Sequence, residues 1–485
     1  MNNTTLSNFA QSIHSIGCDI SNPEIQNIIK QILSLKSLAL PPVCLPDLLL
    51  KPRVEAPASF AAATTNTIVP ELSAPSVGCG MGIAKTSLTR DEVDADFFER
   101  FFKEMRAHLG PRYGFFKNCF LWLGFLKRPK QKYDLNREEL ERVIREGAPA
   151  VLEKYGFSPS LLDAIEYNGS LFTEDEQKKI NIKNILPRVS FKTGMHNLGY
   201  GFKGNHFLEI QYVEDILDPA QADAWGIQKN QVMIMYHGGG GAIPFHVGRY
   251  FGSRKKDRGN VRVTISVAMG KLFFHFFSWE GMTHCWRRFR YYFLPRSFTE
   301  IPADSAEGMR LMQALKAALN YSYAFHVAML KRIQDSLKKT TNNINTEVNL
   351  VWDNVHNSIL PETISSKTVI VHRHTANHAH PGKPLIVSGF NTTCSYLAVA
   401  LPGAEARLFS ADHGAGGVIK RFHDEGKSRQ HPYGHKTYIY QTKEPRIQEA
   451  AHITDEGINH VINHLERESI ARPVVRLRPL AVFKG

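Results

Sequence analysis

The residues of this chain best suited to chemistry are histidines and one cysteine, each set among glycines. His413 lies in the run Asp412-His413-Gly414-Ala415-Gly416-Gly417, which follows apolar, β-branched segments. Glycines let the backbone come close to a bulky ligand such as a nucleotide phosphate. A histidine on such a turn can be a nucleophile, a base or a metal ligand, or only a polar residue in a tight turn. The turn by itself leaves these interpretations open.

Three other stretches place a metal-binding side chain beside a glycine-rich turn. Cys79 is flanked by glycines, His206 leads from a glycine-rich loop into a strand, and His237 ends an apolar strand before four glycines. With His356, they offer one thiolate and three imidazoles, a donor set suited to Mn, Fe, Co or Zn. A small buried cysteine and a histidine that caps a strand are the alternatives. The spacings are too long for a local motif, so the sequence alone cannot show that these residues converge.

The composition indicates a large globular protein. The 485 residues carry a net charge of +13, which favours a polyanionic partner. No apolar run approaches the roughly 20 residues that a membrane helix needs. The polar N-terminal residues do not resemble a signal peptide, so we expect a cytoplasmic protein without a membrane partner. The six cysteines lie far apart with no CxxC pair, which argues against a disulfide framework or a zinc ribbon.

Two basic and aromatic clusters are candidates for contact with RNA. The first runs from Arg249 to Arg262 and the second from Trp286 to Tyr292. Interleaved arginines and aromatic rings suit stacking on unpaired bases and contact with phosphates. A surface loop over a mixed core explains each cluster equally well.

The elements that must position these residues follow from hydrophobic periodicity. Residues 1–40 are predicted to form a helical lead-in with a helix starting at Asn22-Pro23, a docking or oligomerising element, and residues 41–75 an irregular loop with short strands. A capping box at 89–92 opens an amphipathic helix, and a long helix is predicted over 305–338. There is no internal repeat, so we expect one large domain over 41–485.

An ordered series of short motifs resembles the RtcB family of RNA-splicing ligases. It consists of GCGM, GNHFLE, HGGGG, DNVHN, VHR, SY, HGAG and a terminal KG, in order from about Leu45 to Gly485. The resemblance implies a mixed α/β (α+β) single domain, with stacked β-sheets around a metal cleft and helices outside. It also implies an enzyme that uses GTP and Mn²⁺ to join RNA ends carrying a 2′,3′-cyclic phosphate or 3′-phosphate to 5′-hydroxyl ends.

The resemblance also implies roles for single residues. His413 would be the nucleophile that becomes guanylylated. Cys79 would bridge two metal ions, with His206 on one side and His237 and His356 on the other. The guanine nucleotide and its phosphates would be contacted by four further residues, Asn205, Glu209, Arg421 and Lys484.

Several positions depart from the family pattern. The family has Asp three residues before the cysteine, where this chain has Ser76, so whether one or two ions bind is open. Two family arginines fall on Gly241 and Gly417, and a family lysine falls on His374. The PGSMGT stretch reads SGFNTT, and the PDVH stretch reads Pro46-Asp47-Leu48-Leu49.

Most of these losses fall on phosphate and nucleotide contacts, whereas the cysteine, most histidine ligands and the nucleophile remain. We therefore expect a divergent member acting on a restricted RNA, and the resemblance also suggests an archease-like activator as a partner. Two alternatives are a non-catalytic protein that binds RNA ends and a single-metal phosphoesterase acting on RNA ends.

Overall fold

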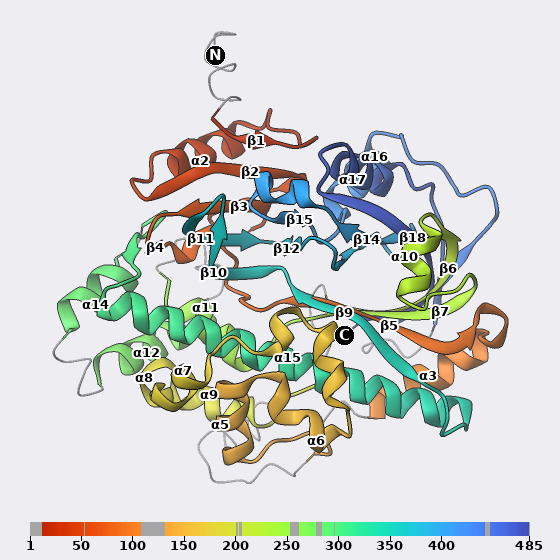
Figure 1. Cartoon of the computed structure of the whole chain (residues 1–485), viewed down its shortest axis with the longest axis horizontal. Coiled ribbons are helices and arrows are strands. Elements are labelled where there is room, and N and C mark those ends of the chain that lie inside the picture. The colour runs from red at the N-terminus through yellow and green to blue at the C-terminus, as the bar shows by residue number, and fades with distance from the viewer. Residues whose placement is uncertain are drawn as a thin grey trace.

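Two large β-sheets and one long helix organise the chain. The computed structural model describes residues 12–52, 54–107, 131–199, 202, 206–252, 261–277, 284–294, 296–441 and 447–484. In Figure 1 the sheets lie above the long helix α15 (Ala306–Thr341), and further helices lie below it. The fold is mixed α/β in a single domain, as predicted. None of the described helices is long and apolar enough to span a membrane.

The larger sheet carries most of the candidate site. Its strands follow the order β13-β14-β18-β6-β7-β5-β9, and β16 and β17 extend it beside β18. The central pairs β18–β6, β6–β7, β7–β5 and β5–β9 are all antiparallel. The bounds are β5 (Gly80–Thr89), β6 (Phe207–Ile216), β7 (Gln231–Gly238), β9 (Val348–Val355), β13 (Pro384–Val387), β14 (Ser395–Ala400), β16 (Lys436–Gln441), β17 (Gln448–Ala451) and β18 (Ala471–Lys484).

The second sheet has the order β1-β2-β3-β11-β10 and buries both of its faces. On β3, Ala61 and Ala63 pack into one core, whereas Phe60 and Ala62 pack against α2 (Pro23–Leu33). This is the two-residue alternation expected of a strand between two layers. The bounds are β1 (His14–Ser15), β2 (Leu38–Leu49), β3 (Ala58–Thr64), β10 (Asn357–Ile364) and β11 (Lys367–His374), with two-stranded sheets formed by β4 (Thr67–Ile68) with β8 (Ile301–Pro302) and β12 (Ala376–His378) with β15 (Ser410–Asp412).

The helix α15 is the main support of the larger sheet. Ser305 caps it by accepting a hydrogen bond from the backbone of Gly308, and most of its residues are buried in the largest core. The other helices are α3 (Ala95–Ala107), α5 (Arg137–Glu146), α6 (Leu152–Tyr155), α7 (Glu174–Lys179), α8 (Ile182–Ile185), α9 (Arg188–Gly194), α10 (Pro219–Ala224), α11 (Ala242–Tyr250), α12 (Val261–Phe276), α14 (Cys285–Tyr292), α16 (Gly416–Asp424) and α17 (Glu456–Arg467). Short 3-10 helices are η1 (Pro70–Leu72), η2 (Arg90–Glu92), η3 (Ala148–Val151), η4 (Pro159–Ala164), η5 (Glu166–Gly169) and η7 (Pro402–Arg407).

The structure confirms several predicted elements and corrects one. The long helix, the helix after Asn22-Pro23 and the capping box at Thr89 are present. The prediction of an irregular loop with short strands over 41–75 was wrong, because β2 extends for 12 residues and pairs with β3. Prolines within β2 hide its alternation, and the pairing with β3 is correspondingly interrupted by register shifts. The domain division at residue 40 stays a prediction.

Candidate metal centre

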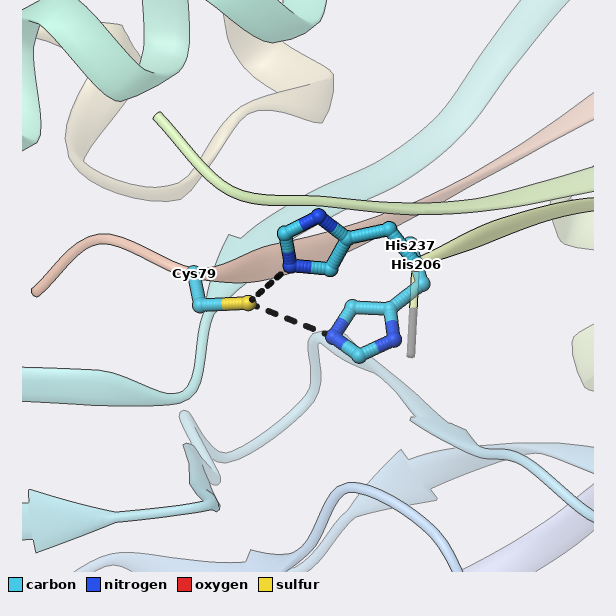
Figure 2. Close-up of side chains that lie close together, drawn as sticks. All are labelled: Cys79, His206 and His237. Atoms are coloured by element: carbon cyan, nitrogen blue, oxygen red, sulfur yellow. Dashed lines mark hydrogen bonds between the residues drawn. The ribbon is translucent and has the colours of Figure 1, made fainter. Parts of the chain in front are cut away.

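Three of the predicted ligands converge at one end of the larger sheet. The Cys79 Sγ lies 3.4 Å from His206 Nε2 and 3.3 Å from His237 Nε2. The three possible ligand atoms all lie within 4.8 Å of one another. Figure 2 shows the thiol facing both imidazole rings. The cysteine, 127 and 158 positions from the two histidines in sequence, thus forms a compact S and N donor group with them.

Three neighbouring strands produce this convergence. Cys79 directly precedes β5, His237 is the penultimate residue of β7, and His206 directly precedes β6. The antiparallel register places Met81 opposite His237, and Phe207 opposite His237 on the other side. The starts of β5 and β6 and the end of β7, which lies between them, therefore meet at the same end of the sheet.

One glycine of the loop after β7 is required by this arrangement. A Cβ atom on Gly239 would lie 2.7 Å from Cε1 of His206. Any side chain there would displace the imidazole. The glycine run that follows His237 thus serves close packing of the second ligand.

His356 and His413 lie beside this group without joining it. His356 follows β9 and its backbone N–H donates to the Cys79 carbonyl at 2.9 Å. Its ring lies 5.0 Å from that of His237 and 4.3 Å from that of His413, between centroids. The structure therefore brings His206, rather than His356, into the tightest group with Cys79 and His237.

Burial sets the protonation of the centre. Burial lowers the pKa of His206 to about 4 and the pKa of His413 to about 3, and it lowers the pKa of His237 and His356 well below the usual range. These imidazoles are neutral at pH 7 and keep a free lone pair. Burial raises the pKa of the Cys79 thiol to about 12, so a cation must displace its proton on binding.

The residues fit a borderline divalent cation. Within the described part of the chain, the buried Nδ1 atom of His356 has no hydrogen-bond partner. An unpaired nitrogen beside a thiol and two imidazoles suits Mn, Fe, Co or Zn better than Mg or Ca. A bound ion would satisfy polar atoms that are otherwise costly to bury.

A buried ion pair between His326 of α15 and Asp353 of β9 supports the strand end that carries His237. His326 Nδ1 lies 2.8 Å from the Asp353 carboxylate, and its Nε2 lies 3.2 Å from the Gly238 carbonyl. Burial alone would lower the pKa of His326, but Asp353 raises it above the usual value. The Tyr236 hydroxyl donates to the same carboxylate at 2.5 Å. These contacts fix the end of β7, and with it the His237 ring.

Lys51 is a charged neighbour that sequence reasoning missed. It is half-buried, and its charge opposes the rise in the pKa of the Cys79 thiol and further lowers the pKa of His413. A lysine at the end of the apolar run Leu48-Leu49-Leu50 was the only available signal. Burial lowers the pKa of Lys51 and Asp47 opposes that fall, and in its charged form the ammonium group can attract phosphate to the centre.

The departures from the family pattern have structural counterparts. The side chain of Ser76 is exposed, and its hydroxyl accepts a hydrogen bond from the Asn357 amide at 3.2 Å. Gly241 has φ +72 and ψ −143, a conformation that is nearly restricted to glycine. A Cβ on Gly417 would lie 2.6 Å from Leu49. The backbone conformation thus disfavours a side chain at Gly241, and a side chain at Gly417 would require the Leu49 side chain to move.

The predicted nucleotide contacts are dispersed around the centre. Glu209 is buried on β6, accepts a hydrogen bond from Gln211, and has its pKa raised to about 8 by burial, although Lys484 opposes that rise. Lys484 ends β18 and pairs with Phe207. Arg421 lies in the last turn of α16, over the Phe422 ring. Asn205 lies outside the described residues.

The second basic and aromatic cluster is divided between surface and core. On α14, Trp286 is exposed and stacks with Phe289. Arg288 is buried and paired with Glu307, to which Tyr292 also donates. Much of this cluster is therefore structural. The first cluster lies partly in residues 253–260, outside the described residues.

The fold and the cysteine–histidine group agree with the comparison of the sequence with known families. Residues 29–485 match the family described as tRNA-splicing ligase RtcB, and the chain belongs to that family.

The chain is also similar to individual archaeal proteins named tRNA-splicing ligase RtcB. It is 26% identical to that of Pyrococcus horikoshii over 84% of this chain, a match that spans 44% of the archaeal protein. It is 25% identical to that of Thermococcus kodakarensis over 84% of this chain and 80% of the relative. The chain is 25% identical to the protein of Nanoarchaeum equitans over 86% of this chain and 82% of the relative.

Proposed function

We propose that this protein is a GTP- and Mn²⁺-dependent RNA ligase acting on a restricted substrate. It joins 2′,3′-cyclic phosphate or 3′-phosphate ends to 5′-hydroxyl ends through a guanylylated histidine. The observation that carries the proposal is the His413 ring, neutral at pH 7 and 6.0 Å from the ring of His237, between centroids. Family membership supports the RNA ligase class.

The metal would be held by Cys79, His206 and His237, with His356 beside them. A bound cation neutralises triphosphate charge and assists departure of pyrophosphate. The neighbouring His326–Asp353 pair holds the strand end from which His237 projects. The number of ions, one or two, follows from whether Ser76 can replace a carboxylate.

His413 would supply the covalent step. A ring nitrogen attacks the α-phosphorus of GTP, forming an N–P bond while the P–O bond to pyrophosphate breaks. The low pKa of His413 keeps that lone pair free of a proton at neutral pH. A 2′,3′-cyclic phosphate is first opened by water, which breaks the bond between phosphorus and the 2′-oxygen and leaves a 3′-phosphate. The guanylyl group then passes from His413 to an oxygen of the 3′-phosphate, and the 5′-hydroxyl displaces GMP while losing its proton.

The remaining predicted residues would hold the nucleotide. Glu209 and Lys484 lie on the adjacent strands β6 and β18, and Asn205 is assigned to the nucleotide by the family motif alone. Lys51 adds a positive charge near His413, and Arg421 is assigned to a phosphate. Phosphoryl transfer depends mainly on such positioning and charge stabilisation. A cytoplasmic location and an archease-like activator stay predictions.

A second candidate is a non-catalytic protein that binds RNA ends with the same fold. It is favoured by the absence of the two family arginines, since Gly241 has a backbone conformation nearly restricted to glycine and a side chain at Gly417 would have to displace Leu49. This candidate does not require His413, and neither does a single-metal phosphoesterase. Retention of a neutral histidine beside the metal group therefore favours the ligase.

The test is covalent labelling with α-labelled GTP and Mn²⁺, followed by denaturing electrophoresis. We expect label on the wild-type protein and none on His413→Ala. The same variant should bind metal like the wild type, because the Cys79 group does not include His413. Well-folded, metal-loaded protein that takes up no label would exclude the ligase and leave the RNA-end-binding protein.

A further inference from the structure

We propose that Glu166, His378 and His380 form a second metal site, separate from the Cys79 group. Their possible ligand atoms lie within 4.8 Å of one another. Glu166 Oε1 is 3.4 Å from His378 Nδ1 and 3.7 Å from His380 Nε2. Two imidazoles and a carboxylate thus converge on one point. The inference does not depend on the proposed ligase reaction.

The two histidines are placed on the same side of the chain by strand geometry. His378 ends β12 and His380 follows two residues later, so the rings lie side by side with centroids 3.5 Å apart. Glu166 begins η5, more than two hundred residues earlier in the sequence. Tyr167 and Asn168 after it both have positive φ. This unfavourable backbone conformation directly follows Glu166, at the point where its carboxylate faces the two histidines.

The Glu166 carboxylate is already oriented for a cation. Its Oε2 accepts hydrogen bonds from the Val355 backbone N–H at 3.1 Å and from the Tyr323 hydroxyl at 2.9 Å. These two donors fix the carboxylate plane. The Oε1 atom is left to face the two imidazoles. Hydrogen bonds that hold a ligand from behind in this way are a regular feature of metal sites.

The charges around the group also favour a cation. Among the described residues, Arg373 and Glu362 are the main charged groups acting on Glu166, and these two are paired through two hydrogen bonds. Lys383 adds a positive charge on the side of His380. With that pair neutral overall, Glu166 contributes the remaining negative charge once ionised. Burial and Arg373 lower the pKa of His378 and His380, so both imidazoles are neutral at pH 7 and each keeps a lone pair that a cation can use.

The donor set indicates the kind of ion. Two histidines and one carboxylate match Zn²⁺ or a similar first-row ion with an open fourth position. His380 has 33% of its side chain exposed, whereas Glu166 has 1%, so an ion can enter past His380. The Tyr167 hydroxyl is 2.8 Å from His378 Nδ1. On metal binding it must give up this hydrogen bond and then stands beside the ion.

The test compares metal stoichiometry in variants of the full-length protein. Wild type and the variants are dialysed against Zn²⁺ and analysed for bound zinc by mass spectrometry. We expect His380→Ala to bind about one zinc fewer than wild type, a loss of affinity of at least ~10-fold. His423→Ala removes an exposed histidine of α16 and should match wild type. The comparison holds whether or not the Cys79 group is loaded.

A spectroscopic experiment assigns the ion to this group. In Cys79→Ala loaded with Co²⁺, we expect visible bands of a nitrogen and oxygen site without thiolate charge transfer. Adding His380→Ala or His380→Gln should remove these bands while circular dichroism stays unchanged. Equal zinc content in wild type and His380→Ala, or no cobalt bands in Cys79→Ala, would overturn the proposal.

Discussion

The Cys79 and Glu166 groups are built alike but differ in charge. Each gathers two neutral imidazoles and one acidic side chain from segments far apart in sequence. The Cys79 group has a thiol whose pKa is about 12 and the Lys51 ammonium nearby. The Glu166 group has a carboxyl group whose pKa is raised by burial to about 7. The acidic donor and its charged neighbours, rather than the histidines, therefore distinguish the two groups.

The largest expected effect is that of Cys79→Ser on the first group. A neutral hydroxyl is a much weaker ligand than a thiolate, so metal affinity there should fall by more than ~100-fold. Guanylylation should disappear with it, while the Glu166 group keeps its ion. Calorimetric titration with Zn²⁺ measures metal binding at both groups. Loss of every metal-binding event in this variant would show that the two groups are not independent.

A buried histidine outside both groups provides a test of stability. His372 accepts a hydrogen bond from the Val69 N–H at 2.9 Å, and burial lowers its pKa to about 4. The unfolded chain binds a proton near pH 6.5 and the folded chain only near pH 4. Stability from this group is therefore lost as the pH falls through that window, by about 2 kcal/mol between pH 7 and pH 5.

The variant His372→Gln should lack that part of the pH dependence, because a glutamine can accept the same hydrogen bond without titrating. Urea unfolding at pH 7 and pH 5 measures the difference between the two proteins. The other buried groups titrate equally in both and cancel. Parallel pH profiles would contradict the low pKa of His372.

The smallest expected effect is that of Lys51→Met, which tests the difference in charge between the Cys79 and Glu166 groups. Binding of a divalent ion to the protonated Cys79 group releases one proton, so the site gains one positive charge, which Lys51 opposes. Lys51→Met should tighten metal binding by about fivefold, near 1 kcal/mol, and weaken nucleotide binding. Lys51→Arg keeps the charge, so metal binding and nucleotide binding should both stay close to those of the wild type. Weaker metal binding in Lys51→Met would contradict this sign.

The sequence predicted those elements whose pattern of apolar residues or glycines is contained in one short stretch. The 36-residue α15 and the strand ending at His237 were both predicted, the strand from its continuous apolar run over residues 232–236. The β2 strand was missed because Pro41, Pro42 and Pro46 interrupt its pattern. The positions of these elements relative to one another depend on strand pairing between distant parts of the chain. A short stretch of sequence contains no information on that pairing.

The same limit applies to the sites. The family motifs named Cys79, His206 and His237, but not that these three form the tightest group. Lys51 and Glu166 were missed because only tertiary contacts bring them to histidines. The contact between Glu166 and His378 joins residues 212 positions apart. A carboxylate at that separation carries no local signal.

The wide separation of the ligands has a consequence for folding. Cys79 is 127 residues from His206 and 158 from His237, and His413 comes much later still. Contacts of such high sequence separation form slowly, because loop closure precedes their stabilisation. During synthesis the cysteine emerges long before its partners. The centre is therefore completed late, and until then the thiol stays open to oxidation or to the wrong metal.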